Sequence, residues 1–285
     1  MKTIIVTTDF SSTALNAAEY ATNMALGIHA NLLLLHVFQT PVLYSKVPLT
    51  VSGESIMQVA TNEEHIKIEA EKGLEQLKNE LTKKTGGKID IETEMRFGVF
   101  YDELKTLCKR IQPYAVIMGS QGTTATERLF FGGHTVFAMK HLKWPIITVP
   151  PDAKYSSVQK IVLACDFDEV IDVIDLAPID EIKKMVHDMN AELHILNIGK
   201  KKIFNPDLVF DSGLLKEKLA ELNPVFHFIS TDDTDEGIIE FTEKNKIDLL
   251  IILPKRHDLL DKLIHKSHTK QLVLHSHVPV MALHQ

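Results

Sequence analysis

The stretch "VIMGSQGTTATERLFFGGHTVFAMKHLKWPIITVP", residues 116–150, holds two apolar runs separated by a glycine-containing loop and a helix-like segment. The first run ends at Gly119, and the second run, 145–150, opens with proline. Apolar runs without polar alternation are typical of strands buried on both faces of a parallel sheet. A strand, a loop, a helix and a second strand in this order form the crossover unit of an open α/β sheet.

The same alternation continues toward the amino terminus. Apolar runs predict strands at 3–9, 31–38, 88–97, 114–119 and 145–150. Amphipathic segments predict helices at about 55–84, 100–111 and 133–142, and a first helix with Ser12 as its N-cap and Gly27 as its stop. This order predicts an open, mostly parallel five-stranded sheet with helices on both faces, a Rossmann-like α/β fold.

The pattern then restarts in the second half of the chain. "QKIVLACDFDE" (159–169) matches "MKTIIVTTDFSS" (1–12), with Asp-Phe at the same place. "HKSHTKQLVLHSHVPVMAL" (265–283) matches "FGGHTVFAMKHLKWPIITV" (131–149). Such a repeat indicates an internal duplication. The seam "VPPDAKYSS" has the proline and small polar residues of a linker.

We therefore predict two tandem domains, residues 1–150 and 158–285. Each domain ends in an apolar strand, "PIITVP" in the first and "PVMALH" in the second. Pairing of these two strands within the chain would cover two apolar edges that otherwise invite aggregation. A homodimer and the identity of a protein partner stay open at this stage.

Composition excludes several classes of function. The chain has 285 residues, a formal charge of −7 and no block of basic residues, which argues against nucleic-acid binding driven by electrostatics. No run reaches the ~18 apolar residues of a membrane span. Cys108 and Cys165 are too few for a disulfide framework, so we expect two core thiols in a reducing cytoplasm.

Three predicted strands end in residues that could bind a ligand. Asp9, Val37 and Gly119 fall at carboxyl ends of strands, where parallel sheets bind their ligands. Glycines before a helix expose backbone N–H groups to an anion. The spacing of Gly119, Gly122 and Gly132 is neither the P-loop pattern nor the dinucleotide fingerprint. The alternative is structural: the glycines form only a tight turn, Asp9 only caps the following helix or hydrogen-bonds the loop, and Val37 only packs in the core.

The spacing resembles the G-x2-G-x9-G-(S/T) motif of the universal stress protein family. The opening "IIVTTDFS", the strand "LLLLHVF" and the closing "WPIITVP" are similar to that family as well. The resemblance covers nearly the whole chain as two copies. Subunits of that family pair through their last strands, so the resemblance implies that "PIITVP" and "PVMALH" pair within this chain and give a pseudo-twofold monomer. It implies an adenine nucleotide alpha-hydrolase-like fold that binds ATP or another adenine nucleotide, with Mg²⁺ as an optional companion. It also implies a role as a sensor or regulator in the stress response.

The resemblance assigns roles to residues of the first half. Asp9 and Val37 would hold the adenine side, Met118 and Gly119 would lie against the ribose, and later glycines and hydroxyls would hold the phosphates. The candidate residues are Thr7, Asp9, Val37, Met118, Gly119, Gly122, Gly132, Gly133, His134 and Thr135. Two residues depart from the family pattern: Gly133 replaces a Ser or Thr, and Thr7 replaces a Pro. We therefore expect weakened or altered phosphate binding.

The second half departs further. Pro254 is expected at the position of Gly119, and Lys266 and Ser267 at those of Gly132 and Gly133. Proline has no N–H to offer, and lysine adds a side chain where a close approach is needed. The sequence therefore predicts that this half has lost the nucleotide cradle.

No nucleophile, base and orienting acid come together in the sequence, so we expect no enzyme. Two alternatives stay open: a protein-interaction scaffold in which both sites are vestigial, and a slow ATP hydrolase. His134 and His268 occupy matching positions and favour a structural role. His265 and His268 have the spacing of a metal pair but lack a third ligand, so we expect surface histidines and no metal site.

Overall fold

The computed structural model describes residues 1–38, 53–120, 134–165, 176–199, 213–254 and 268–284. The strands are β1 (Lys2–Thr7), β2 (Ala30–Phe38), β3 (Ile91–Phe97), β4 (Ala115–Gly119), β5 (Ile146–Val149), β6 (Lys160–Ala164), β7 (Glu192–Gly199), β8 (Val225–Ser230), β9 (Leu249–Ile252) and β10 (Val280–Ala282). The helices are α1 (Ser12–Ile28), α2 (Gly53–Thr85), α3 (Phe100–Ile111), α6 (Leu176–Met189), α8 (Gly213–Leu219), α9 (Thr234–Lys244) and α10 (His268–His275), with a 3₁₀ turn η1 (Ala220–Leu222). Residues 134–141 are helical as well.

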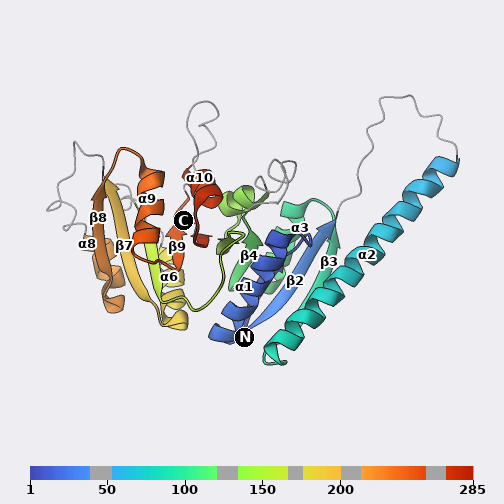
Figure 1. The fold of residues 1–285 in the computed structure, drawn as a ribbon, viewed down its shortest axis with the longest axis horizontal. Coiled ribbons are helices and arrows are strands. Elements are labelled where there is room, and N and C mark those ends of the chain that lie inside the picture. The colour runs from blue at the N-terminus through green and yellow to red at the C-terminus, as the bar shows by residue number, and fades with distance from the viewer. Residues whose placement is uncertain (39–52, 121–133, 166–175, 200–212, 255–267, 285) are drawn as a thin grey trace.

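The strands form one ten-stranded sheet in the order β3-β2-β1-β4-β5-β10-β9-β6-β7-β8 (Figure 1). Neighbouring strands are parallel except β5 and β10, which pair antiparallel with Ile147 opposite Met281. The hydroxyl of Thr148 also donates to the carbonyl of Val280 at 3.2 Å across this pair. The α/β fold and the intrachain pairing of the two last strands, both expected from the sequence, are confirmed.

Strand side chains alternate between two apolar layers. Ile4 and Val6 of β1 point into the layer formed with α1, α2, α6 and α8, whereas Ile5 points into the layer formed with α3, residues 134–141, α9 and α10. The central strands are buried on both faces, which is why their sequences run apolar without alternation. The helices thus cover both faces of the sheet, as predicted.

Helix α3 shows how the local sequence fixes an element. Leu104, Leu107 and Cys108 form its buried face. Acidic side chains lie in its first turn and basic ones in its last, where they complement the helix dipole. Burial raises the pKa of the Cys108 thiol to about 12. Cys108 is therefore a core residue, as expected.

The two ends of α1 differ from the prediction. The N-cap is Ser11, whose Oγ accepts a hydrogen bond from the amide of Ala14 at 3.2 Å, and Ser12 is the first helical residue. The helix passes Gly27 and ends at His29, which adopts a positive φ of 53°. A Cβ at Gly27 would lie 3.2 Å from the Tyr155 hydroxyl. Gly27 therefore serves close packing and does not stop the helix.

Contacts beside the sheet fix the first half to the linker and to the second half. The buried Asn16 amide donates to the carbonyls of Pro150 and Ala153, both at 3.0 Å. Lys2 of β1 forms an ion pair with Asp188 of α6 at 2.6 Å. These contacts join α1 to the linker and β1 to the second half.

No helix in the described part of the chain is both long enough and apolar enough to cross a membrane.

Candidate functional site

The strand order places three predicted site positions at the carboxyl ends of neighbouring strands. β1 lies between β2 and β4 and runs parallel to both. Thr7 ends β1, Gly119 ends β4 and Val37 is the next-to-last residue of β2. Thr7 is buried, and Val37 is half-buried against the layer of α3. The carboxyl ends of the three strands therefore lie side by side, with Asp9 just beyond the first.

The turn after β1 is ordered by its own side chains. Thr8 Oγ1 accepts a hydrogen bond from the amide of Phe10, and Asp9 Oδ1 accepts one from the amide of Ser11, both at 3.0 Å. Asp9 thus bonds the loop, as the structural alternative expected. Its second oxygen, Oδ2, makes no hydrogen bond or ion pair with any residue that the structure describes. The carboxylate is oriented and keeps one oxygen for a donor.

Phe10 links this turn to α2. It adopts a positive φ of 65°, and its ring lies 4.8 Å from that of His36. His36 Nδ1 donates to the carbonyl of Thr8 at 2.8 Å. A Cβ at Gly73 of α2 would lie only 3.0 Å from the Phe10 ring. The sequence reading missed these contacts, because Gly73 and Phe10 are far apart along the chain.

Gly119 is required by close packing. A Cβ at this position would lie 2.8 Å from Cγ2 of Thr13 and 3.2 Å from the Thr13 carbonyl carbon and oxygen. The end of β4 therefore contacts the first turn of α1 directly. Met118, one residue earlier, buries its side chain in the layer of α3, so only its backbone remains for a ligand.

Two hydroxyl groups beside Gly119 lack partners. Thr13 Oγ1 and Ser120 Oγ are buried and make no hydrogen bond with any residue that the structure describes. A buried polar group left unpaired costs about 1–3 kcal/mol. The sequence reading missed both residues. Their positions in the sequence could have indicated both, because Ser120 follows the first motif glycine and Thr13 lies in the first turn of the helix after Asp9.

The helix at 134–141 brings one more predicted residue to β4. Thr135 is buried, and its hydroxyl donates to the carbonyl of Gly119 at 3.3 Å. His134 is exposed, and its ring lies 5.4 Å from that of Phe100. Gly122, Gly132 and Gly133 lie outside the described residues. Thr7, Asp9, Gly119 and Thr135 therefore lie near the carboxyl ends of β1 and β4. The side chains of Met118 and His134 point elsewhere.

Hydrogen bonds fix how the two halves correspond. The amide of Val116 donates to the carbonyl of Pro145 at 2.8 Å, and the amide of Leu250 donates to that of Pro279 at 3.0 Å. Both prolines precede the last strand of their half. Val116 therefore corresponds to Leu250.

This register corrects one sequence expectation. Gly119 lies three residues after Val116, and Leu253 lies three residues after Leu250, so these two residues correspond. Pro254 therefore corresponds to Ser120. The expectation that Pro254 stands at the position of Gly119 is wrong by one residue. Leu253 carries a Cβ where Gly119 has none, so the second half still lacks a glycine there. Lys266 and Ser267 lie outside the described residues.

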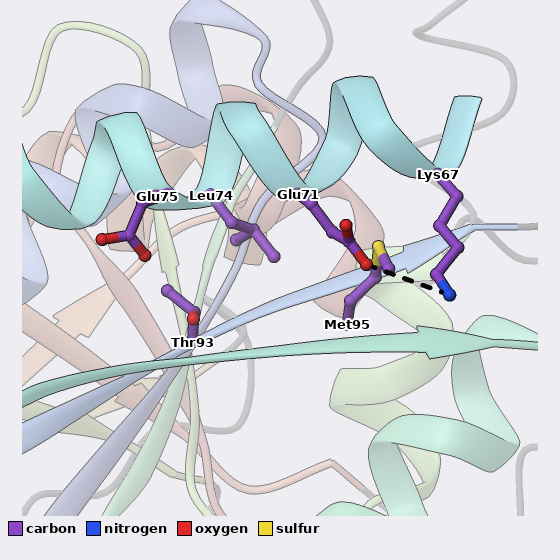
Figure 2. A pocket seen from close by; sticks show the side chains of 6 residues that line it. All are labelled: Lys67, Glu71, Leu74, Glu75, Thr93 and Met95. Carbon is purple, nitrogen blue, oxygen red and sulfur yellow. Dashed lines mark ion pairs between the residues drawn. The ribbon is translucent and has the colours of Figure 1, made fainter. Parts of the chain in front are cut away.

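A cavity of about 540 Å³ lies between α2 and the edge strand β3 (Figure 2). The residues that line it are Lys67, Glu71, Leu74, Glu75, Thr93 and Met95. Its rim has two carboxylates and one ammonium, with Lys67 and Glu71 4.0 Å apart. This excess of negative charge disfavours a phosphate. None of the predicted site residues lines it.

Among the described residues, no three or more His, Cys, Asp or Glu side chains are grouped so as to hold a metal ion. His265 of the possible metal pair lies outside those residues.

The ten-stranded, mostly parallel sheet with helices on both faces defines an α/β protein with an adenine nucleotide alpha-hydrolase-like fold. The chain belongs to the universal stress protein family, whose family model matches residues 1–150 and 169–284. The two matched segments make it a tandem member.

Three relatives illustrate the similarity. Universal stress protein MJ0531 of Methanocaldococcus jannaschii is 27% identical over 153 residues, which cover 54% of this chain and 84% of its own. A universal stress protein of known structure from Archaeoglobus fulgidus is 16% identical and covers 99% of this chain and 96% of its own, with a TM-score of 0.65. Another universal stress protein, solved in complex with cAMP, is 20% identical and covers 52% of this chain and 96% of its own, with a TM-score of 0.35.

Proposed function

We propose that the first half binds an adenine nucleotide at the carboxyl ends of β1, β2 and β4. The protein would act as a nucleotide-dependent regulator in the stress response. The observation that carries this proposal is a pair of buried hydroxyls, Thr13 Oγ1 and Ser120 Oγ, that make no hydrogen bond with a described residue. Thr13 packs against Gly119, and Ser120 follows Gly119 in the chain. A ligand with acceptor oxygens would satisfy both and remove their desolvation cost.

The surroundings favour an anionic ligand. The first turn of α1 offers its positive dipole end, and the end of β4 lies against it. The overall charge of −7 provides no general attraction, so the affinity must come from local donors. By the family motif, these donors would include the backbone N–H groups of Gly122, Gly132 and Gly133.

Asp9 and Thr135 would complete the site. Asp9 Oδ2 is the acceptor that remains for an N–H or O–H group on the nucleoside. Thr135 already donates to Gly119, so its hydroxyl oxygen would accept from the ligand or its proton would turn toward a phosphate. Gly133 lacks the hydroxyl that the motif places there. A lost charge-assisted hydrogen bond costs about 1.5–3 kcal/mol, roughly one to two decades of affinity.

A thermal-shift titration of the full chain with ATP, ADP and AMP tests the proposal. A ligand that binds only the folded state stabilises it by about 2.7 kcal/mol at 100 times its Kd. We expect at least one of the three nucleotides to raise the melting temperature. Asp9→Ala should lose the shift, whereas Asp166→Ala, its counterpart in the second half, should keep it. Absence of any shift at millimolar nucleotide would reject the proposal.

Thr13→Val separates a ligand role from a structural one. The substitution keeps the shape of the side chain and removes a buried hydroxyl that has no partner. We therefore expect the free protein to be as stable as the wild type or more so, and the nucleotide-induced shift to shrink. A lower melting temperature without ligand, together with an unchanged shift, would show that the hydroxyl serves only the fold.

A further inference from the structure

Two histidines of the second half contact each other beneath α9. His194 Nδ1 of β7 lies 2.8 Å from His227 Nε2 of β8, and the rings are nearly parallel, 18° apart with centroids at 5.1 Å. A hydrogen bond between two ring nitrogens needs a proton on one and a lone pair on the other. If both rings carry both protons, the bond is lost and two positive charges face each other.

The surroundings make a second charge costly. His194 is 6% exposed, and its Nε2 is buried and makes no hydrogen bond within the described part of the chain. From β7, Glu192 Oε2 approaches that nitrogen at 3.5 Å. From α9, the apolar ring of Phe241 packs edge-on against His227 at 4.8 Å. From β6, the positive charge of Lys160 opposes protonation of His227.

The net effect of these surroundings is to lower the pKa of His227. Burial lowers the pKa of His227 most, the neighbouring His194 lowers it further and Lys160 adds to this, while Glu192 raises it. The direction in which pH changes the stability follows from the lowered pKa of His227. Above the ordinary histidine pKa of about 6.5, folded and unfolded chains are both neutral at this site. As the pH falls below it, the unfolded state takes up the proton first, so stability is lost.

We propose that the His194–His227 pair is a proton-sensitive latch that holds strand β8 on β7 and releases it when the pH falls below neutrality. β8 is the last strand of the sheet, and β7 is its only partner among the described strands. Its release therefore requires no other strand to separate. The latch lies at the far end of the sheet from β1, β2 and β4, and it does not depend on the proposed nucleotide site.

Hydrogen exchange of the full chain at pH 7.5 and 5.5 tests the latch. After correction for intrinsic exchange rates, we expect protection of the β8 amides, Val225–Ser230, to fall severalfold between the two pH values. The amides of β2 should keep their protection. Constant protection of β8 across this range would overturn the proposal.

A double variant removes the titration without leaving an unpaired nitrogen. His194→Leu with His227→Phe replaces both partners by apolar groups, which is close to neutral for stability. Its β8 protection should be independent of pH, whereas His65→Gln, on the exposed face of α2, should keep the wild-type response. A pH response that survives the double substitution would refute the latch.

A measurement on the wild type alone covers the case in which the double variant does not fold. Nitrogen NMR of the imidazole rings should show the pair taking up a proton below pH 6.5 at the same pH at which β8 opens. An ordinary titration of His227 while β8 stays protected would equally contradict the proposal.

Discussion

Gly119→Leu is expected to lower the melting temperature and abolish nucleotide binding. Even the Cβ of a new side chain would lie 2.8 Å from Thr13 Cγ2 and 3.2 Å from the Thr13 backbone. Backbone atoms cannot turn aside as a flexible side chain can, so β4 and α1 must separate. Overpacking of this kind costs about 1–3 kcal/mol and occasionally more. The separation would also displace Thr13 and Ser120, on which the proposed site depends.

The second half supplies the matched control. Leu253 occupies the position of Gly119 there, so Leu253→Ala alters the equivalent strand end without touching the first half. This control should lose some stability and keep its nucleotide response. Thermal melts with and without ATP compare the two variants. If Gly119→Leu melts like the wild type and still responds to nucleotide, the tight contact between β4 and α1 is not a feature of the protein.

Met281→Asp is expected to have the second large effect, on the joint between the halves. Met281 and its antiparallel partner Ile147 are both fully buried, in the layer that contains α1 and α6. A carboxylate at this place would be buried among the apolar side chains of this layer, and uncompensated buried charges cost about 3–5 kcal/mol. Because β5 and β10 close the edges of both halves, each half should lose stability.

Chemical denaturation followed by circular dichroism measures this effect. Leu15→Asp is the control, since it adds the same charge at an apolar side chain of α1 that is 38% exposed. The control should remain within about 0.5 kcal/mol of the wild type, as surface changes usually do. Equal stability of the two variants would mean that the β5–β10 pairing does not hold the halves together.

Much of the fold could be predicted because the signals were local. Strands buried on both faces read as unbroken apolar runs, and the duplication repeats them in the same order. The expected helix at 100–111 coincides with α3, whose apolar residues recur on one face and whose charges match the helix dipole. The family resemblance implied the pairing of the last strands and their apolar edges favoured it, and the structure shows it.

The other features of the fold depend on backbone geometry and on contacts that cannot be derived from the sequence alone. Ser11 and Ser12 are both good N-caps, and only the backbone geometry decides between them. Gly27 was read as a helix stop, although its role is to admit Tyr155 from the linker. The one-residue shift that aligns Gly119 with Leu253 follows from the strand register rather than from matching the two sequences by eye.

The candidate site, too, could be predicted only in part from the sequence. The family motif named Asp9 and Gly119, because both are marked by residue type and spacing. Thr13 and Ser120 gained importance only when the structure showed both hydroxyls buried without a partner among the described residues, with Thr13 packed against that glycine. His194 and His227 meet across neighbouring strands from separate segments of the chain, and neither segment carries a motif.

The central claim is that the first half holds one adenine nucleotide and the second half holds none. Equilibrium dialysis of the full chain against labelled ATP, ADP and AMP counts bound nucleotide directly. The account predicts one nucleotide per chain at saturation, one in Asp166→Ala and none in Asp9→Ala. A count of zero or of two in the wild type, or a count that Asp9→Ala leaves unchanged, would contradict it.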